Sequence, residues 1–316
     1  MLARLRLFGR LALVRPRFAV GYVIVAIVAL LAILAPLIAP YSPTEADSLN
    51  FLQPPGADHL FGTDNVGMDI FSRAIYAPRI DLTIAILGTM LSALLGGSIG
   101  ALVGYYSSGR GVRVWLSYIV MRAADVLQAF PVFVFAIALV ASLGQSIQTV
   151  VLAIAFVNAP IYLRLMRSQV LSIRSMRYVE ASTVNGLSDF QTITRHVIPN
   201  AMGPVLAQLS INIGWGILLT ASLSFIGAGV RAPTPEWGSM IAMGFQNVVT
   251  GQWWPSMFPG AMLAVTVFGF SLVGASIEVL ADPARRRQLL SEVRQRGARG
   301  AAAGQASMEQ ASVEQA

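Results

Sequence analysis

The sequence predicts an all-α integral membrane protein with six transmembrane helices. The chain has 316 residues, of which 55% are hydrophobic and only 12% charged, and its mean hydropathy is +0.66. Soluble domains carry about 25% charged residues, so this composition is typical of a membrane protein. Six apolar runs, separated by polar segments, are each long enough for a helix that crosses a bilayer.

The chain begins with a basic segment, residues 1–17, which contains several arginines. An apolar run over residues 18–39 follows, close to the roughly 20 residues that a helix needs to cross a bilayer. A secretory signal peptide has a shorter apolar region and a cleavage site of small residues, and residues 35–40 are a poor match to such a site. We therefore expect residues 18–39 to form an uncleaved first transmembrane helix.

Residues 40–81 form a polar segment rich in proline, glycine and aspartate. Aspartate often caps turns and helices, so we expect Asp69 to begin a helix. The acidic residues lack the spacing of an EF-hand calcium loop and its final glutamate. The sequence therefore predicts no metal site in this segment.

Five more apolar runs follow, over residues 82–106, 126–143, 147–163, 201–226 and 258–280. The first of them is rich in glycine, which allows neighbouring helices to approach closely in lipid. Pro131 lies inside the second and should kink it, because proline cannot donate a backbone hydrogen bond.

The polar interval over residues 168–199 is predicted to contain two short helices. Gly186 can end the first, and Ser188 precedes Gln191 with the spacing of a capping box that begins the second. Pro199 is expected to end the second helix. Helices this short are marginal alone in water, so we interpret the segment as a docking element for another protein.

The last polar loop, residues 227–255, contains Trp237, Trp253 and Trp254. Indole rings favour the headgroup region of a bilayer, so we expect these side chains to be interfacial anchors. The final segment, residues 281–316, begins with arginines and then becomes rich in alanine, glycine, serine, glutamine and glutamate. That composition is typical of a tail that is at least partly disordered.

The arginines predict the orientation of the chain. All 22 basic residues are arginines, and only Arg73, Arg79 and Arg231 fall in the first and last polar loops. Cytoplasmic segments of membrane proteins carry an excess of basic residues. Both termini and the loop over residues 168–199 are therefore predicted to be cytoplasmic. The excess of arginines in cytoplasmic segments explains the net charge of +7, so we predict no nucleic-acid partner. We expect membrane lipid to surround the chain.

The absence of certain residue types excludes several chemistries. Without a lysine the chain has no P-loop lysine, so any ATP hydrolysis must belong to a partner. It also has no cysteine, and its histidines, His59 and His196, are predicted to lie on opposite sides of the membrane. We therefore predict a non-enzyme without a catalytic set.

Polar residues inside the apolar runs have two possible roles. The runs contain essentially no ionisable residue away from their ends, which disfavours a proton-coupled transporter. Asn158, Gln208 and Asn212 could line a solute pathway or could form hydrogen bonds between helices. The second role is the more common for any one such residue.

Three segments resemble one family of transport proteins. The first segment contains Glu180, Ala181 and Ser182, then Gly186, and then residues 196–199. It resembles the EAA loop of ATP-binding-cassette importer permeases. Residues 59–69 resemble the GTDxxGRD pattern of peptide and nickel permeases, with methionine in place of the usual arginine. Residues 233–238 and 252–255 resemble the PTPxWG and WW segments of the same branch. The chain thus resembles inner-membrane permeases of the dipeptide, oligopeptide and nickel family.

The resemblance implies a type I importer permease fold, with the transmembrane domain over residues 82–280, in a bacterial inner membrane. It implies a second, homologous permease subunit, two cytoplasmic ATPases that bind ATP and magnesium, and a periplasmic or lipid-anchored solute-binding protein. No cofactor is expected in this chain. The residues implied to contact the ATPases or to shape the coupling loop are Glu180, Ala181, Ser182, Gly186, His196 and Pro199.

The implied substrate is a di- or oligopeptide, and residues 40–81 would then be periplasmic. Nickel complexes, glutathione or another small solute are alternatives with the same architecture. An ATP-independent secondary transporter or channel, or a membrane scaffold without transport, is a further alternative. Co-purification with an ATPase and uptake by reconstituted vesicles separate these classes.

Overall fold

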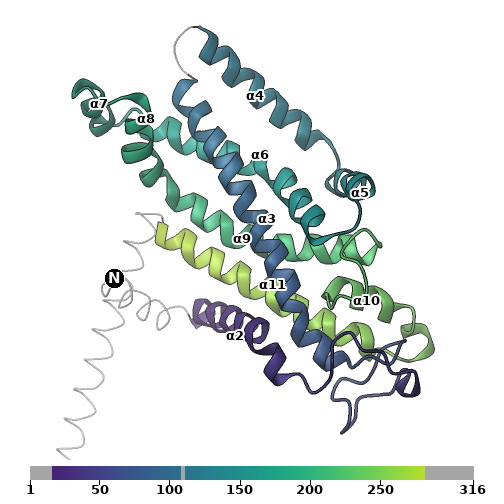
Figure 1. The fold of residues 1–316 in the computed structure, drawn as a ribbon. Helices are drawn as coiled ribbons and strands as arrows, with labels where there is room; N and C mark the ends of the chain where they lie inside the picture. The colour runs from purple at the N-terminus through teal and green to yellow at the C-terminus, as the bar shows by residue number, and fades with distance from the viewer. Residues whose placement is uncertain (1–15, 108–110, 282–316) are drawn as a thin grey trace, which may run out of the picture.

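The computed structural model describes residues 16–107 and 111–281, and within these ranges the chain is built from helices (Figure 1). Most of the basic N-terminal segment and of the C-terminal tail lies outside the described residues, so the predictions for these two segments are not tested. In chain order, the helices and helical turns are α2 (Pro16–Ile38), η1 (Ser48–Asn50), α3 (Ile70–Tyr106), α4 (Val112–Ala129), α5 (Val132–Leu143), α6 (Ile147–Ile173), α7 (Arg177–Val184), α8 (Asp189–Thr192), η2 (Ile193–Val197), α9 (Ile198–Phe225), α10 (Trp237–Phe245), η3 (Val248–Thr250) and α11 (Trp254–Ala281).

The long helices α3 and α6 run parallel and form the most extensive contact of the molecule (Figure 1). Glycines on α3 make this contact possible. A Cβ atom on Gly96 would collide with the backbone of Ala159, and one on Gly100 with the backbone of Leu163. The predicted role of glycine in close helix packing is confirmed here.

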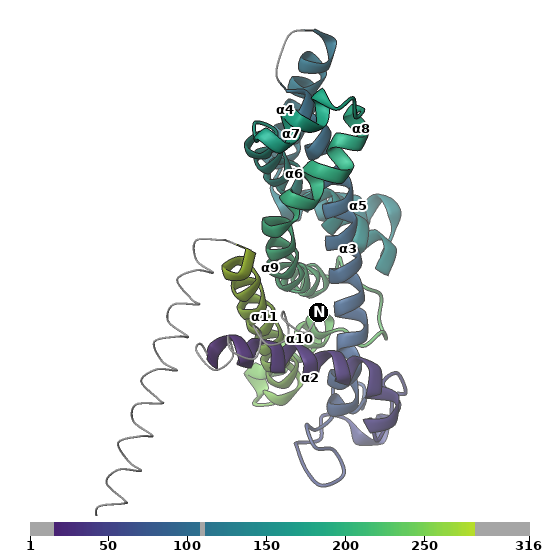
Figure 2. The same ribbon diagram turned by 90° about the vertical axis from the view of Figure 1, so that its left-hand side faces the viewer.

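Helices α9, α11 and α2 pack beside this pair. The Ser210 hydroxyl of α9 donates a hydrogen bond of 3.1 Å to the Phe270 carbonyl of α11. The Tyr22 hydroxyl, near the start of α2, donates one of 3.3 Å to Ser276 near the end of α11, and α2 crosses α11 (Figure 2). A hydrophobic core between α3, α6 and α9 includes the buried residues Tyr162, Met166 and Val205.

Within residues 16–107 and 111–281, five helices are long and apolar enough to cross a membrane, and the pair α4 and α5 provides a sixth crossing if it is counted as one. The predicted kink at Pro131 is instead a break, because the two helices meet at 90°. Phe130 adopts an extended backbone, with φ −75° and ψ 134°. A residue before proline is driven out of the helical region by the proline ring, which explains the break.

The apolar run over residues 82–106 is part of a longer helix. Helix α3 begins at Ile70, directly after the predicted cap Asp69, so the polar residues before Leu82, including the fully buried Asp81, belong to the helix. The prediction that ionisable residues are absent concerned the apolar runs alone, and the longer helix buries two ionisable side chains before the run, Arg73 and Asp81.

Pro199 does not end a helix but lies in the first turn of α9. The π-helical turn over Ile193–Val197 directly before α9 already interrupts the regular hydrogen bonds between residues i and i−4, so proline is tolerated there.

Candidate functional site

Helices α7 and α8 lie at one end of the molecule and α10 at the other (Figures 1 and 2). Gly186 ends α7 with a φ of +80°. Its N–H donates to the Thr183 carbonyl at 3.0 Å, and the Leu187 N–H donates to the Ser182 carbonyl at 3.2 Å. This pair of hydrogen bonds is a Schellman motif. The prediction that Gly186 ends the first short helix is confirmed.

The second short helix begins as predicted. Ser188 accepts a hydrogen bond from the Gln191 N–H, and the Gln191 side chain accepts one from the Ser188 N–H, which completes a capping box. Helix α8 then continues through a π-helical turn over Ile193–Val197, which contains the half-buried His196, directly into α9. The docking segment is therefore continuous with a long helix of the membrane domain.

The exposed face of this segment combines charge and apolar surface. Glu180 and Ala181 are exposed on α7, and Val184 is 86% exposed one turn after Glu180. Phe190 of α8 is 73% exposed. We call Glu180, Ala181, Val184 and Phe190 the α7–α8 surface. Ser182 is not part of it, because its buried hydroxyl donates to the Val179 carbonyl at 2.7 Å and lies 3.3 Å from Thr192 of α8.

Asp189, the first residue of α8, joins this segment to α3. The Tyr105 and Tyr106 hydroxyls at the end of α3 donate to its two carboxylate oxygens, at 3.3 and 3.1 Å. Arg113 of α4 lies 3.5 Å from the same carboxylate. Sequence reasoning missed this cluster, because the three partners are far from Asp189 along the chain. The paired tyrosines that end the glycine-rich run were its only visible sign.

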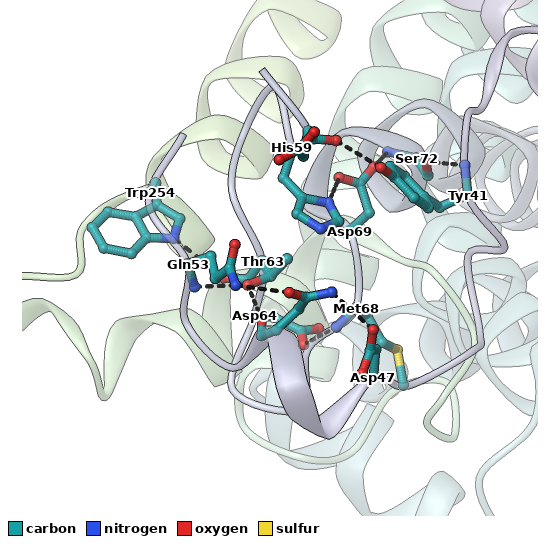
Figure 3. Close-up of polar contacts among 12 residues, drawn as sticks. Tyr41, Asp47, Gln53, His59, Thr63, Asp64, Met68, Asp69, Ser72 and Trp254 are labelled. Carbon is teal, nitrogen blue, oxygen red and sulfur yellow. Dashed lines mark hydrogen bonds and ion pairs between the residues drawn. The ribbon is translucent and has the colours of Figure 1, made fainter. Parts of the chain in front are cut away.

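At the α10 end, Asp69 caps α3 as predicted (Figure 3). Its carboxylate accepts a hydrogen bond from the Ser72 N–H at 2.7 Å and lies 2.9 Å from Nδ1 of His59. The ring of Tyr41 packs beside the His59 ring, with 4.7 Å between centroids. These contacts attach the loop that follows α2 to the start of α3.

Arg73 links both polar segments of this end to α3. Its side chain is almost completely buried and donates to the Pro43 carbonyl at 2.8 Å and to the Pro233 carbonyl at 3.3 Å. The Asp64 carboxylate lies 3.7 Å away and also accepts hydrogen bonds from the backbone. The aspartates of this segment thus act as backbone acceptors. In the sequence, Arg73 is recognisable only as one of the few arginines outside the predicted cytoplasmic segments, and its burial could not be predicted.

The prediction that the tryptophans are interfacial anchors is wrong for Trp237 and Trp254. Trp237 is fully buried, and its indole N–H donates to the Ala74 carbonyl at 3.1 Å. The indole N–H of Trp254 donates to the Thr63 carbonyl at 3.2 Å (Figure 3). Backbone carbonyls of the protein satisfy these donors, so the rings need no headgroup partner. Trp253 is 47% exposed.

Two of the three polar residues predicted inside helices meet at a cavity of about 420 Å³. Asn158 of α6 and Asn212 of α9 line it, together with residues from α4, α5 and the break between them. Gln208 does not line the cavity but donates a hydrogen bond of 2.8 Å to Asn212. In the described part of the chain, no group of three His, Asp or Glu side chains is arranged to hold a metal ion.

Comparisons with known proteins agree with this architecture. Residues 96–287 match the family described as binding-protein-dependent transport system inner membrane component. The chain belongs to this family. Residues 13–55 also match the N-terminal transmembrane domain of oligopeptide transport permease C.

Curated relatives of this permease cover most of its length. It is 38% identical over 264 residues to a dipeptide transport system permease of Alkalihalophilus pseudofirmus, which covers 84% of both chains. It is 40% identical over 261 residues to a probable D,D-dipeptide transport system permease of Escherichia coli, which covers 83% of this chain and 85% of the relative.

A solved structure supports the fold of the permease. A chain of the inward-facing MetNI methionine ABC transporter superposes with a TM-score of 0.54 and 17% identity. The match covers 67% of this chain and 96% of the other. The predicted all-α, type I importer permease fold is confirmed.

Proposed function

We propose that this permease forms half of a pathway that imports di- or oligopeptides across the bacterial inner membrane. A second, homologous permease supplies the other half, and a periplasmic or lipid-anchored binding protein delivers the peptide at the α10 end. Two cytoplasmic ATPases bind ATP and magnesium and contact the α7–α8 surface. This orientation agrees with the distribution of the arginines. The peptide substrate is inferred from the relatives, whose names specify dipeptides.

The α7–α8 surface is the observation that carries this proposal. It exposes the large apolar side chains of Val184 on α7 and Phe190 on α8, together with Glu180 one turn before Val184, and exposed apolar surface rimmed by polar residues is typical of a protein contact. The same segment is joined to α3 through Asp189 and is continuous with α9. A protein that displaces this surface therefore moves two membrane helices directly. Without lysine the chain carries no P-loop lysine of its own, and we propose that it has no catalytic activity.

Affinity purification of this chain with its partner subunits tests the proposal. A matched pair of variants places a charge on either end: Val184→Asp on the α7–α8 surface, and Val249→Asp near α10, where the side chain is 93% exposed. We expect Val184→Asp to release the ATPases and Val249→Asp to retain them. An ATPase that remains bound to both variants would contradict the assignment of the surface.

Uptake by reconstituted vesicles tests the substrate. We expect ATP-dependent accumulation of a labelled dipeptide when the binding protein is present. Accumulation without ATP would identify a secondary transporter or channel. ATP-dependent uptake of a nickel complex or glutathione, with no uptake of peptide, would retain the architecture and replace the substrate.

A further inference from the structure

A second cavity, lined by arginines, lies between the end of α3, α4 and α6. Its volume is about 330 Å³, within the range of about 300–1,000 Å³ that is typical of small-molecule pockets. The lining includes Ser107 after α3, Tyr118 and Arg122 of α4, and Arg167 of α6. Tyr118 is 57% exposed and the Arg122 side chain is 63% exposed, so a molecule outside the protein can reach this cavity.

Arg167 brings an unpaired positive charge to this cavity. Its side chain is half-buried, and within the described residues its guanidinium makes no hydrogen bond and no ion pair. Nε is covered by the protein, whereas the two terminal nitrogens keep accessible surface. A charge that is partly removed from water is costly unless it is paired. An anion from outside this chain would therefore be stabilised beside Arg167.

The charges around Arg167 are mainly positive. Asp125 is the only acidic residue over residues 107–179 of the sequence. Its carboxylate is already shared, because it lies 3.1 Å from Arg122 and 2.7 Å from Arg164. Three arginines therefore accompany one carboxylate, which leaves an excess of two positive charges at this place. The excess favours a ligand with a net negative charge.

The arginines lie at the expected cytoplasmic boundary of the bilayer. The apolar run over residues 126–143 begins after Arg122, and the run over residues 147–163 ends before Arg167. Trp115 of α4 is 66% exposed, and exposed indole rings favour the level of the lipid headgroups. The depth of the cavity therefore matches that of lipid phosphates.

We propose that this cavity binds the phosphate of an anionic phospholipid of the cytoplasmic leaflet, such as phosphatidylglycerol, with Arg167 and Arg122 as its cationic partners. The five N–H donors of a guanidinium form a fixed fork that matches phosphate oxygens. The Tyr118 hydroxyl makes no hydrogen bond within the described residues and can donate as well. Val114 and Met121 complete the lining with apolar surface for the start of the acyl chains. Basic pockets between membrane helices on the cytoplasmic side suit anionic headgroups.

The lipid site adjoins the contacts that hold the α7–α8 segment. Ser107 directly follows Tyr106, whose hydroxyl donates to Asp189 at 3.1 Å. Helix α4 contacts the same carboxylate through Arg113, at 3.5 Å. A lipid bound between α3, α4 and α6 therefore stabilises the helices to which α8 is attached. This inference goes beyond the proposed function and does not depend on which solute is transported.

Cysteine labelling tests occupancy of the cavity, because the chain contains no cysteine of its own. Met121→Cys places a thiol in the lining, and Val126→Cys is the matched control on α4, since Val126 is exposed and does not line the cavity. The complex is purified with its partner subunits in detergent and titrated with phosphatidylglycerol. We expect the lipid to slow the labelling of Met121→Cys by a maleimide and to leave Val126→Cys unchanged.

Two further arms identify the chemistry of the ligand. Phosphatidylcholine carries the same phosphate together with a positive choline group, which the excess of arginines disfavours, so it should protect Met121→Cys much less than phosphatidylglycerol does. Inorganic phosphate at the same concentration has no acyl chains to hold it at this depth, so it should give no protection.

Substitution of the arginines tests recognition. In the Met121→Cys background, Arg167→Gln should raise the phosphatidylglycerol concentration needed for half-maximal protection by about tenfold, the loss expected for hydrogen bonds to a charged group. Arg167→Lys keeps the charge without the fork and should fall between Arg167→Gln and the parent. Arg79→Gln is the control, because Arg79 is exposed on α3 and does not line the cavity. Arg122→Gln should also weaken protection, and it replaces Arg167→Gln as the test if that variant does not fold.

Three results would overturn the inference. Equal protection by phosphatidylglycerol and phosphatidylcholine would show that the cavity does not select an anionic lipid. Equal protection by inorganic phosphate would assign the cavity to a soluble anion. Protection that neither Arg167→Gln nor Arg122→Gln weakens would leave another protein chain as the partner of these arginines. Each result leaves the proposed function standing, because uptake of a dipeptide is measured separately, and a complex that imports no peptide would leave the lipid site standing.

Discussion

Single residues determine how the α7–α8 segment is attached to the rest of the molecule. Gly186 adopts a left-handed conformation between the two helices, and a side chain there would meet open space, so only the backbone geometry restricts it. Asp189 binds three side chains of α3 and α4. The glycine was predicted from its position after an apolar stripe. The partners of Asp189 could not be predicted, because no local pattern shows which distant segments meet.

We predict that Gly186→Val uncouples ATP hydrolysis from uptake. A left-handed conformation costs an L-residue about 1–2 kcal/mol, and a β-branched residue more, which is enough to shift the preferred arrangement of α7 and α8 about tenfold. ATPase rate and dipeptide uptake, measured in the same vesicles, should show a ratio of uptake to hydrolysis about tenfold lower. Gly186→Asn is the control, because asparagine tolerates this conformation. Unchanged transport by Gly186→Val would contradict the prediction.

We predict that Asp189 acts together with the tyrosines of α3. Asp189→Ala removes the acceptor of two hydrogen bonds. The double variant Tyr105→Phe with Tyr106→Phe removes their donors, so each protein should show uptake lowered about threefold to tenfold. Groups in one network are not additive, so the combined variant should be no worse than Asp189→Ala. Uptake and ATPase rate of all three proteins provide the measurement. Effects that multiply in the combined variant would show that the residues act independently.

At the scale of helices, composition predicted which segments are apolar, and tertiary contacts determined where each helix ends. The polar residues between Ile70 and Leu82 resemble a loop in sequence, but they are helical. Distant segments contact the buried side chains: Arg73 donates to the Pro43 carbonyl, and Asp81 accepts from the Trp237 N–H.

Proline had opposite effects in two places: Pro131 follows a broken helix, and Pro199 lies within the first turn of one. Whether a proline breaks a helix or is tolerated in it depends on its distance from the helix start. The sequence indicates where a helix starts only weakly.

We predict that two nearby glycines of α3 respond oppositely to the same substitution. Alanine favours a helix over glycine by about 1 kcal/mol. At Gly97 the added Cβ has its nearest neighbour at 3.9 Å, so Gly97→Ala should be neutral or stabilising. At Gly100 the Cβ would collide with the backbone of Leu163, and overpacking of this kind costs about 1–3 kcal/mol.

Thermal unfolding of the purified complex in detergent measures both glycine variants. Gly100→Ala should lower the unfolding temperature, and Gly97→Ala should not. An equal decrease for both would indicate that helix flexibility, rather than close contact with α6, explains the glycines.

For the whole molecule, charge predicts an orientation that single-cysteine labelling can test. Val249, in the helical turn η3 that follows α10, is 93% exposed, and Val184 on α7 is 86% exposed. Helices α7 and α10 lie at opposite ends of the fold (Figure 1). We expect a membrane-impermeant maleimide to label Val249→Cys in intact cells and Val184→Cys only after the membrane is dissolved and the protein denatured. Labelling of Val184→Cys in intact cells would reverse the orientation and remove the α7–α8 surface from the reach of cytoplasmic ATPases.

The break between α4 and α5 has a consequence for hydration. At Phe130 and Pro131 the ladder of backbone hydrogen bonds is interrupted, and no side chain caps the start of α5. Hydrocarbon offers no partner to the exposed N–H and C=O groups, so unpaired backbone at membrane depth persists only beside protein or water. The backbone at this break must therefore meet either water in the space beside α6 or a second protein chain, so lipid alone cannot cover this side of the molecule.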